Sequence, residues 1–262
     1  MIGHRGAAKC APENTLAGLR KAKALDCRWV EFDVRLTADG QLILLHDEEL
    51  KRTTDGRGKA IALPLAAVRR YDAGGWFDRS FAGEKVPTLA EALSLLGELG
   101  LGANVELKAA RGRETETGAA AAEMLRRLQP AELPTLLISS FHPASLEAAR
   151  DRAPEIARGV LFRVVPKRWR SVAEALDCVT VNADHRLLTP AIVAEIRDSG
   201  YSVLAYTVND PERALTLFAW GVTSVFSDVP HIILAAAARG GSRRPAAAAS
   251  VSAGTQRQGA AG

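Results

Sequence analysis

The sequence predicts a (β/α)8 (TIM) barrel with a small insertion after an early strand. Short apolar runs alternate with helical patterns along the chain, which is typical of βα units and a parallel sheet. The strand candidates number about eight, as the barrel requires. Two of them are apolar on one face and charged on the other, whereas an open sheet covered on both sides would be apolar on both faces. These observations favour the closed barrel.

The expected elements follow one another in order along the chain. The predicted strands are Trp29–Leu36, Gln41–Leu45, Ala103–Leu107, Thr135–Ser139, Arg158–Phe162, Cys178–Ala183, Ser202–Val208 and Ser224–Ser227. The predicted helices are Thr15–Leu25, Thr88–Leu99, Glu116–Leu128, Pro143–Asp151, Trp169–Leu176, Thr189–Ser199, Pro211–Trp220 and Pro230–Ala238. A Rossmann-type open sheet is the alternative, but no GxGxxG motif follows the first strand.

The alternation within two strands indicates where chemistry lies. In Trp29–Leu36 the apolar positions alternate with Glu31, Asp33 and Arg35, and in Ala103–Lys108 they alternate with Asn104, Glu106 and Lys108. Successive side chains of a strand point to opposite faces. We therefore expect the apolar faces to pack under helices and the charged faces to line the inside of the barrel, near the carboxyl ends of the strands.

Composition and charge limit the function classes. The 262 residues are 47% hydrophobic and 24% charged, with mean hydropathy near zero, which is ordinary globular composition. The net charge of +4 equals the contribution of Arg239, Arg243, Arg244 and Arg257 in the acid-free segment 239–262. The rest of the chain is neutral overall and shows no electrostatic signature of nucleic-acid binding.

The domain organisation follows from the same patterns. We expect residues 1–238 to form the barrel domain, with a glycine- and proline-rich insertion at about 47–87. Residues 239–262 are mainly Ala, Gly, Ser, Arg and Gln and are expected to be disordered. Cys10, Cys27 and Cys178 are odd in number and widely spaced, and no secretory signal or membrane anchor is visible. A cytoplasmic protein is the expectation.

A set of polar residues at strand ends predicts a catalytic site. Three carboxylates (Glu31, Asp33, Glu106), two histidines (His4, His46) and two cations (Arg5, Lys108) are expected to meet at one mouth of the barrel. An all-oxygen ligand set suits Mg²⁺ or Ca²⁺ better than zinc. With a divalent cation and a phosphodiester bound, the formal charges of these groups sum to zero, which favours an anionic substrate.

Simpler interpretations remain open for individual residues. The Glu31/Asp33 pair is as compatible with a salt-bridged structure as with metal binding. Asp39-Gly40 predicts a hairpin turn. His142, His185 and His231 are more typical of surface or core histidines than of catalytic ones. Cys10 lies near His4 in the sequence but has no partner that would act as its base.

Motifs along most of the chain resemble the glycerophosphodiester phosphodiesterase family. They are His4-Arg5-Gly6, Pro12-Glu13-Asn14-Thr15, Glu31-Phe32-Asp33-Val34, Asp39-Gly40, His46-Asp47, Asn104-Val105-Glu106-Leu107-Lys108, Tyr206-Thr207-Val208-Asn209 and Ser227-Asp228-Val229-Pro230. The resemblance extends from residue 3 to about residue 234. It is closest to the cytoplasmic bacterial enzyme that accompanies glycerol-3-phosphate uptake.

The resemblance implies a role for each matched residue. Glu31, Asp33 and Glu106 take the family's metal-ligand positions, and His4 and His46 take its acid and base positions. Arg5 and Lys108 match phosphate-contacting positions, and Tyr206 lies on the substrate side. The implied reaction is hydrolysis of a small-molecule glycerophosphodiester to an alcohol and sn-glycerol 3-phosphate. A lysophospholipase D-like enzyme, a phosphoinositide phosphodiesterase and a non-catalytic binding barrel are the alternatives.

Overall fold

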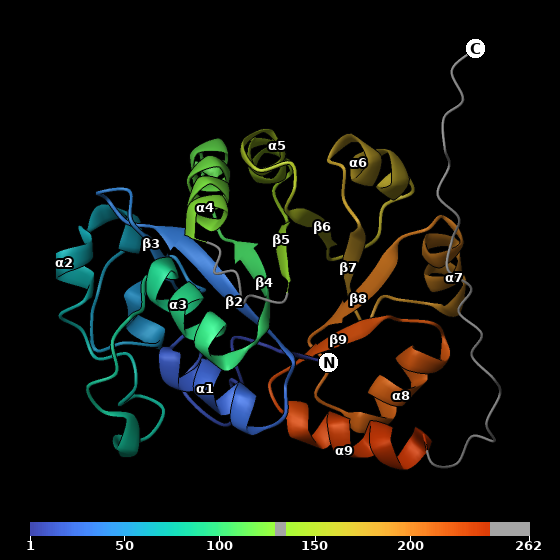
Figure 1. Cartoon of the computed structure of the whole chain (residues 1–262), viewed down its shortest axis with the longest axis horizontal. Helices are drawn as coiled ribbons and strands as arrows, with labels where there is room; N and C mark the ends of the chain where they lie inside the picture. The colour runs from blue at the N-terminus through green and yellow to red at the C-terminus, as the bar shows by residue number, and fades with distance from the viewer. Residues whose placement is uncertain (129–134, 242–262) are drawn as a thin grey trace.

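A closed parallel barrel forms the centre of the molecule (Figure 1). The computed structural model describes residues 1–128 and 135–241. The barrel closes because β1 (Ile2–Gly3) pairs in parallel with both β2 (Trp29–Leu36) and β9 (Ser224–Ser227). Its other strands are β4 (Gly102–Leu107), β5 (Leu136–Ser140), β6 (Ala157–Phe162), β7 (Thr180–Asp184) and β8 (Ser202–Tyr206). The predicted (β/α)8 fold is confirmed.

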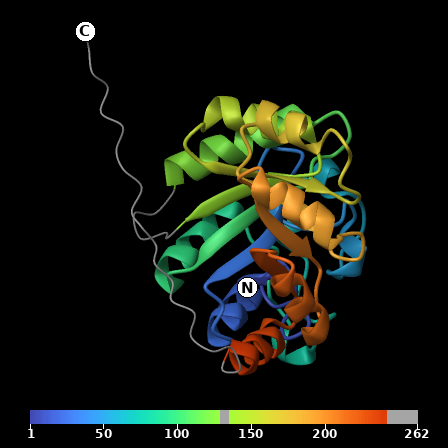
Figure 2. The ribbon, with the colours of Figure 1, turned by 90° about the vertical axis from the view of Figure 1, so that its right-hand side faces the viewer.

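Helices surround the strands on the outside of the barrel, as Figures 1 and 2 show from two directions. They are α1 (Leu16–Ala24), α3 (Leu89–Leu99), α4 (Glu114–Leu128), α5 (Pro143–Arg152), α6 (Trp169–Ala175), α7 (Pro190–Asp198), α8 (Pro211–Ala219) and α9 (Pro230–Gly241). Several of these helices begin at residues whose side chains cap the first turn or favour its start. Thr88 and Glu91 form a reciprocal capping box at the start of α3, and Pro190 and Pro211 open the first turns of α7 and α8.

One predicted barrel strand lies outside the barrel. Gln41–Leu45 contains β3 (Leu42–Leu44), which pairs antiparallel with β2. The two strands form a hairpin, and its turn contains Asp39-Gly40, as the sequence predicted. The first barrel strand is instead β1, which is two residues long. A segment of this length carries no periodicity, so the sequence pattern missed it.

Two layers fill the inside of the barrel. The lower layer is apolar and contains Ile2, Leu137, Leu204 and Phe226, with Trp29 packed against them. The opposite face of the same strands contacts the helices, where Val30, Phe32 and Val34 are fully buried. The upper layer, toward the carboxyl ends of the strands, contains the polar residues of β2 and β4. The alternation of apolar and polar residues along these strands therefore places the apolar side chains against the helices and the polar ones inside the barrel, as expected.

Residues 45–87 pack into a small unit of their own beside β3. This segment contains α2 (Leu65–Val68) and the short 3₁₀ turns Leu50–Arg52, Ala60–Ala62 and Arg79–Phe81. Ile43, Leu45, Leu50, Val68 and Val86 belong to an apolar cluster separate from the main core. The unit lies at the left edge of the view in Figure 1.

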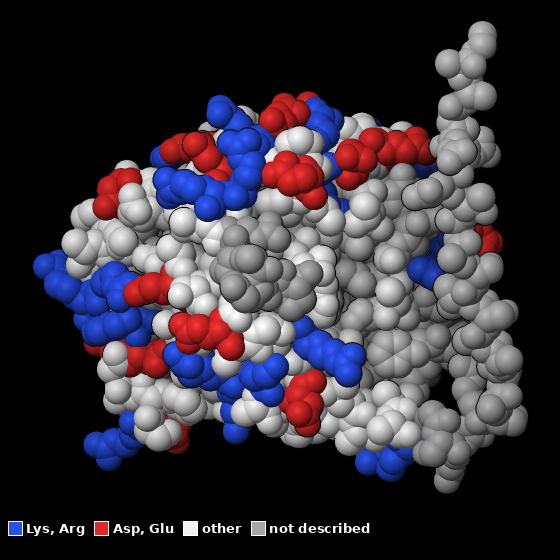
Figure 3. Space-filling view, viewed as in Figure 1, with Lys and Arg blue, Asp and Glu red and all other residues white. Residues whose placement is uncertain are grey.

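Several further features concern the surface and the cysteines. On the face in Figure 3, basic and acidic side chains are interspersed. Among the described residues, no helix combines the length and apolarity needed to cross a membrane.

Cys10, Cys27 and Cys178 are free thiols. The predicted disorder of 239–262 concerns mainly residues 242–262, which lie outside the described residues.

The buried guanidinium of Arg158 provides a test of the fold. The side chain is 1% exposed and donates to the carbonyl oxygens of Leu176 (3.1 Å) and Ile156 (2.7 Å) and to the Asp177 carboxylate (2.6 Å). Arg158→Leu leaves the two carbonyl oxygens without this donor, while water replaces it at the exposed Asp177 carboxylate, so we expect the free energy of unfolding to fall by about 2–4 kcal/mol. Urea denaturation measures the change, with Arg126→Leu on the exposed face of α4 as the control. A loss equal to that of the control would contradict the structural role of Arg158.

Candidate active site

The strand register brings three carboxylates together at the mouth of the barrel. Glu31 and Asp33 point inward from β2, and Asp33 is the direct register partner of Glu106 on β4. Their exposed fractions are 2%, 1% and 8%. One oxygen from each lies within 4.8 Å of the others, which is close enough for a single cation to contact all three.

Burial and mutual repulsion disfavour three negative charges at this point. Removal from water, reinforced by the charge of Asp33, raises the pKa of Glu31 to about 8. Burial likewise raises the pKa of Glu106, against the nearby Lys108 ammonium. Glu31 Oε1 is also buried without a hydrogen-bond partner. A free carboxylate oxygen within an all-oxygen cluster fits a hard divalent cation.

Asp33 is held in its ionised form by its surroundings. Burial alone would raise its pKa, but Lys108 and Arg5 outweigh that effect and hold it well below the usual range. Lys108 Nζ lies 3.5 Å from Asp33 Oδ1, and Arg5 Nε lies 3.3 Å from Oδ2. The amide of Asn14 donates to Oδ2 at 2.9 Å. Lys108 also pairs with Glu106.

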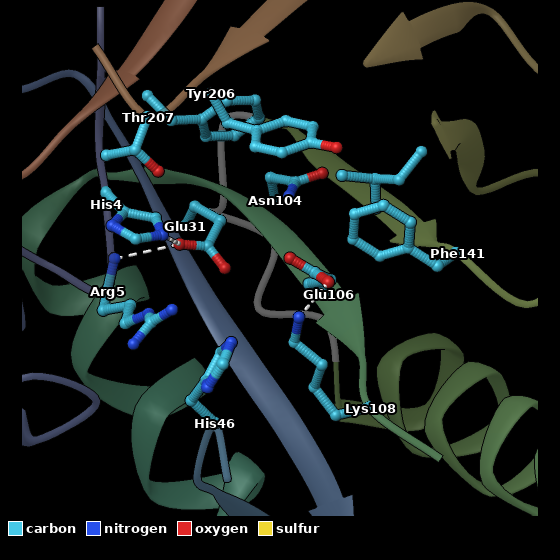
Figure 4. A pocket seen from close by; sticks show the side chains of 12 residues that line it. His4, Arg5, Glu31, His46, Asn104, Glu106, Lys108, Phe141, Tyr206 and Thr207 are labelled. Carbon is cyan, nitrogen blue, oxygen red and sulfur yellow. Dashed lines mark hydrogen bonds and ion pairs between the residues drawn. The ribbon is translucent and has the colours of Figure 1, made fainter. Parts of the chain in front are cut away.

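The His4-Arg5-Gly6 turn brings two site residues to the carboxylates. The Arg5 backbone N–H donates to Glu31 Oε2 at 2.9 Å. Gly6 has φ of +88°, and an added Cβ would lie 2.6 Å from the backbone of Gly18, so only glycine fits here. The turn thereby fixes the position of His4 above Glu31, at an Nε2–Oε2 distance of 3.9 Å (Figure 4).

The two histidines each contact an aspartate. His4 Nδ1 lies 2.6 Å from Asp228 Oδ1, and His46 Nδ1 lies 2.6 Å from Asp47 Oδ1. For His4, burial opposes protonation, but the hydrogen bond to Asp228 and the charge of Glu31 raise its pKa. For His46, burial and the cations Arg5 and Lys108 lower the pKa. The two rings therefore differ in proton affinity across the same cavity.

A cavity of about 210 Å³ lies between these groups (Figure 4). Its lining combines the polar groups with an apolar side, and consists of His4, Arg5, Glu31, His46, Asn104, Glu106, Lys108, Phe141, Leu161, Tyr206, Thr207 and Phe226. Tyr206 donates to the Phe162 carbonyl at 2.8 Å and packs edge-to-face on Phe141. This cavity can hold a small anionic molecule beside a cation.

The structure brings all eight predicted site residues to this mouth. Seven line the cavity, and Asp33 lies beneath it within the carboxylate cluster. The histidines considered less promising lie elsewhere: His142 is exposed, His185 contacts Arg213, and His231 lies near Cys10.

Sequence reasoning assigned no individual role to several residues that contact the site. They include Asn14, Glu13, Asp47, Phe141 and Asp228, and also Asn104, which was expected only to face the inside of the barrel. Asn14 and Asp228 stood within recognised motifs, but only the fold shows which side chains they contact. Asn104 alternates on the same face as Glu106, and that alternation was the available signal. Phe141 directly follows β5, and nothing in its surroundings in the sequence indicated a role.

A closed barrel with ionisable side chains gathered at the carboxyl ends of its strands defines a TIM-barrel enzyme. Residues 4–232 match the glycerophosphoryl diester phosphodiesterase family. The chain therefore belongs to this family, as the sequence motifs predicted, and is a phosphoric diester hydrolase.

Individual relatives align with this protein along nearly its whole length. A glycerophosphodiester phosphodiesterase from Caldanaerobacter subterraneus is 29% identical, over 92% of this chain and 98% of its own length. An Oleispira antarctica phosphodiesterase, solved in complex with the product sn-glycerol-3-phosphate, is 42% identical with a TM-score of 0.88, covering 90% of this chain and 96% of that one. An Agrobacterium tumefaciens glycerophosphodiester phosphodiesterase is 28% identical with a TM-score of 0.76, covering 89% and 98%.

The Asp228 carboxylate provides a test of how His4 is held. Asp228→Asn removes the negative charge beside Nδ1, and we expect kcat to fall by about 10²-fold, within the range of one acid–base group. The kcat value carries the test, because Asp228 also lines the neighbouring cavity and its substitution can alter KM as well. Steady-state hydrolysis of a glycerophosphodiester measures both. Asp198→Asn, on the exposed end of α7, is the matched control, and an Asp228→Asn enzyme with unchanged kcat would contradict the role.

Proposed function

We propose that this enzyme hydrolyses glycerophosphodiesters, such as glycerophosphocholine and glycerophosphoethanolamine, to an alcohol and sn-glycerol 3-phosphate in a reaction that requires Mg²⁺ or Ca²⁺. One observation carries the proposal. A single small cavity is lined by carboxylates, two histidines and two cations, and beneath it Asp33 completes the carboxylate cluster. The Oleispira antarctica relative binds sn-glycerol-3-phosphate, which supports the same product here.

The metal would be held by Glu31, Asp33 and Glu106. When bound, it supplies positive charge to a non-bridging phosphoryl oxygen. Arg5 and Lys108 remain on either side of Asp33 as fixed cations that attract and orient the phosphodiester anion. The free Oδ1 of Asn104, buried in the same cavity, accepts a hydrogen bond from a glycerol hydroxyl.

His4 and His46 act as the proton-transfer pair. One ring takes the proton from the attacking hydroxyl while the other gives a proton to the departing alkoxide. The attacking group that fits the small cavity is the 2-hydroxyl of the substrate's own glycerol, since intramolecular attack gains effective concentration. This attack releases the alcohol and leaves a cyclic glycerol phosphate. A water molecule then opens the ring, with the two histidines exchanging roles, and gives sn-glycerol 3-phosphate. Asp228 and Asp47 hold the two rings in position through Nδ1.

The organisation of the chain is part of the same proposal. Residues 1–238 form the catalytic domain, residues 47–87 are an insertion within it, and the 239–262 segment takes no part in the reaction. The cytoplasm is the proposed location, and a small molecule rather than a nucleic acid is the proposed partner.

Removal of the metal tests the role of the carboxylates. We expect excess EDTA to abolish hydrolysis and Mg²⁺ or Ca²⁺ to restore it. Glu106→Ala should weaken metal binding and regain part of its rate when the cation concentration is raised, because one ligand is lost from the set. Isothermal titration with the metal alone measures affinity independently of activity. Glu98→Ala, exposed on α3, is the control, and full activity in EDTA would overturn the proposal.

Substitution of the histidines separates proton transfer from metal binding. His4→Ala and His46→Ala should each lower kcat by about 10²–10⁴ with a modest change in KM. Metal affinity should survive in both, and the double variant should be little worse than the worse single variant because groups acting as a unit are not additive. His142→Ala, exposed beyond β5, should retain wild-type kcat. Loss of metal binding in a folded His46→Ala protein would make His46 a ligand.

A further inference from the structure

A second chamber of about 520 Å³ opens beside the catalytic cavity. The two share His4, Arg5 and Thr207 as a common wall. The rest of the second chamber is lined by Ala8, Lys9, Glu13, Trp76, Phe77 and Asp228. A phosphodiester centred at this wall, beside His4 and Arg5, has one ester arm facing each chamber.

The two chambers suit different arms of the substrate. The smaller cavity contains the carboxylates and the free acceptor Asn104 Oδ1, which suits the invariant glycerol arm. The second chamber has more than twice the volume and contains none of the three carboxylates. It therefore suits the departing alcohol, which is the part that varies between substrates.

The aromatic wall of the second chamber is held rigidly by its loop. Asp72 Oδ1 accepts from the backbone N–H groups of Gly74 (2.8 Å) and Gly75 (3.0 Å). Gly74 packs so closely that an added Cβ would lie 2.0 Å from the Phe81 carbonyl oxygen. The indole N–H of Trp76 donates to Ala73 O at 2.9 Å, and the ring remains 41% exposed. A fixed, exposed tryptophan is thus presented to the chamber.

The acidic groups of this chamber already have partners within the protein. Glu13 accepts from Arg5 and from Arg52, both at 2.8 Å. Asp228 contacts His4. Lys9, in contrast, is exposed and forms no ion pair with any other residue that the structure describes. Among the charged lining residues that the structure describes, Lys9 is therefore the one whose side chain is left for a ligand.

We propose that this chamber binds the leaving alcohol and selects uncharged polyhydroxyl headgroups, such as inositol or glycerol, over quaternary ammonium headgroups; this inference rests on the proposed function. Trp76 offers a flat face to the C–H groups of a polyol, and Lys9 donates hydrogen bonds to its hydroxyls. A lone tryptophan would attract an ammonium group, but the charge of Lys9 in the same chamber opposes that attraction.

Charge reversal at Lys9 tests the selectivity. The measured quantity is the ratio of kcat/KM for glycerophosphoinositol to that for glycerophosphocholine, which we expect to exceed one in the wild type. Lys9→Glu should lower this ratio by about fivefold, the scale of an exposed charge interaction that changes sign. Lys23→Glu, exposed at the end of α1, reverses the same charge away from the chamber and should leave the ratio unchanged. A ratio that Lys9→Glu does not change overturns the inference.

A substrate without a headgroup separates this inference from the proposed function. The methyl ester of sn-glycerol 3-phosphate leaves the second chamber empty, so Trp76→Ala should not alter its kcat/KM. The same variant should lower kcat/KM for glycerophosphoinositol several-fold, and Trp76→Phe should restore most of it. An equal loss on both substrates makes the Trp76 loop merely structural and overturns the inference alone. Failure of the wild type to cleave either substrate overturns the proposed function and the inference together.

Discussion

Repulsion among three buried carboxylates is the constraint on which the site depends. Glu31, Asp33 and Glu106 are nearly inaccessible to water, and one oxygen of each lies within 4.8 Å of the others. Such an arrangement is costly unless positive charge is close. Lys108 and Arg5 neutralise Asp33, while burial still raises the pKa of Glu31 to about 8. The fold thus holds a carboxylate cluster with one unpartnered oxygen, and the proposed cation would complete it.

The alternation along two strands is why the sequence could predict this cluster. Glu31, Asp33 and Glu106 lie on strands with strict period two, and parallel pairing places Asp33 directly beside Glu106. The same rule could not find Asp228 or Asn14 as partners of His4 and Asp33, because those contacts join residues 224 and 19 positions apart in the sequence that belong to different elements. Local patterns report which face a residue occupies, whereas side-chain partners depend on the closed barrel.

The errors in the fold prediction have the same origin. A two-residue strand such as Ile2–Gly3 has no periodicity, yet its pairing with β2 and β9 closes the barrel. Gln41–Leu45 has a convincing strand pattern, but its hairpin turn commits it to an antiparallel position outside the barrel. The residue types of Gln41–Leu45 predicted that it forms a strand, but they did not show which strand it pairs with. The glycines and prolines of residues 47–87 predict an interruption of the βα pattern, and only the folded structure shows that this segment carries Trp76 to the mouth.

The residues at the mouth of the barrel come from two structurally different parts of the chain, the barrel strands and the segment of residues 45–87. The carboxylates of β2 and β4 lie on strands that are paired on both sides, so their positions are set by the barrel itself. Trp76 belongs to a segment with an apolar cluster of its own, separate from the main core. The segment is joined to β2 at one side, where the Leu45 backbone N–H donates to the Asp33 carbonyl oxygen at 3.0 Å. The proposed selection of the leaving alcohol therefore depends on Trp76 of this segment, whereas the proposed chemistry at phosphorus depends on residues at the ends of the barrel strands.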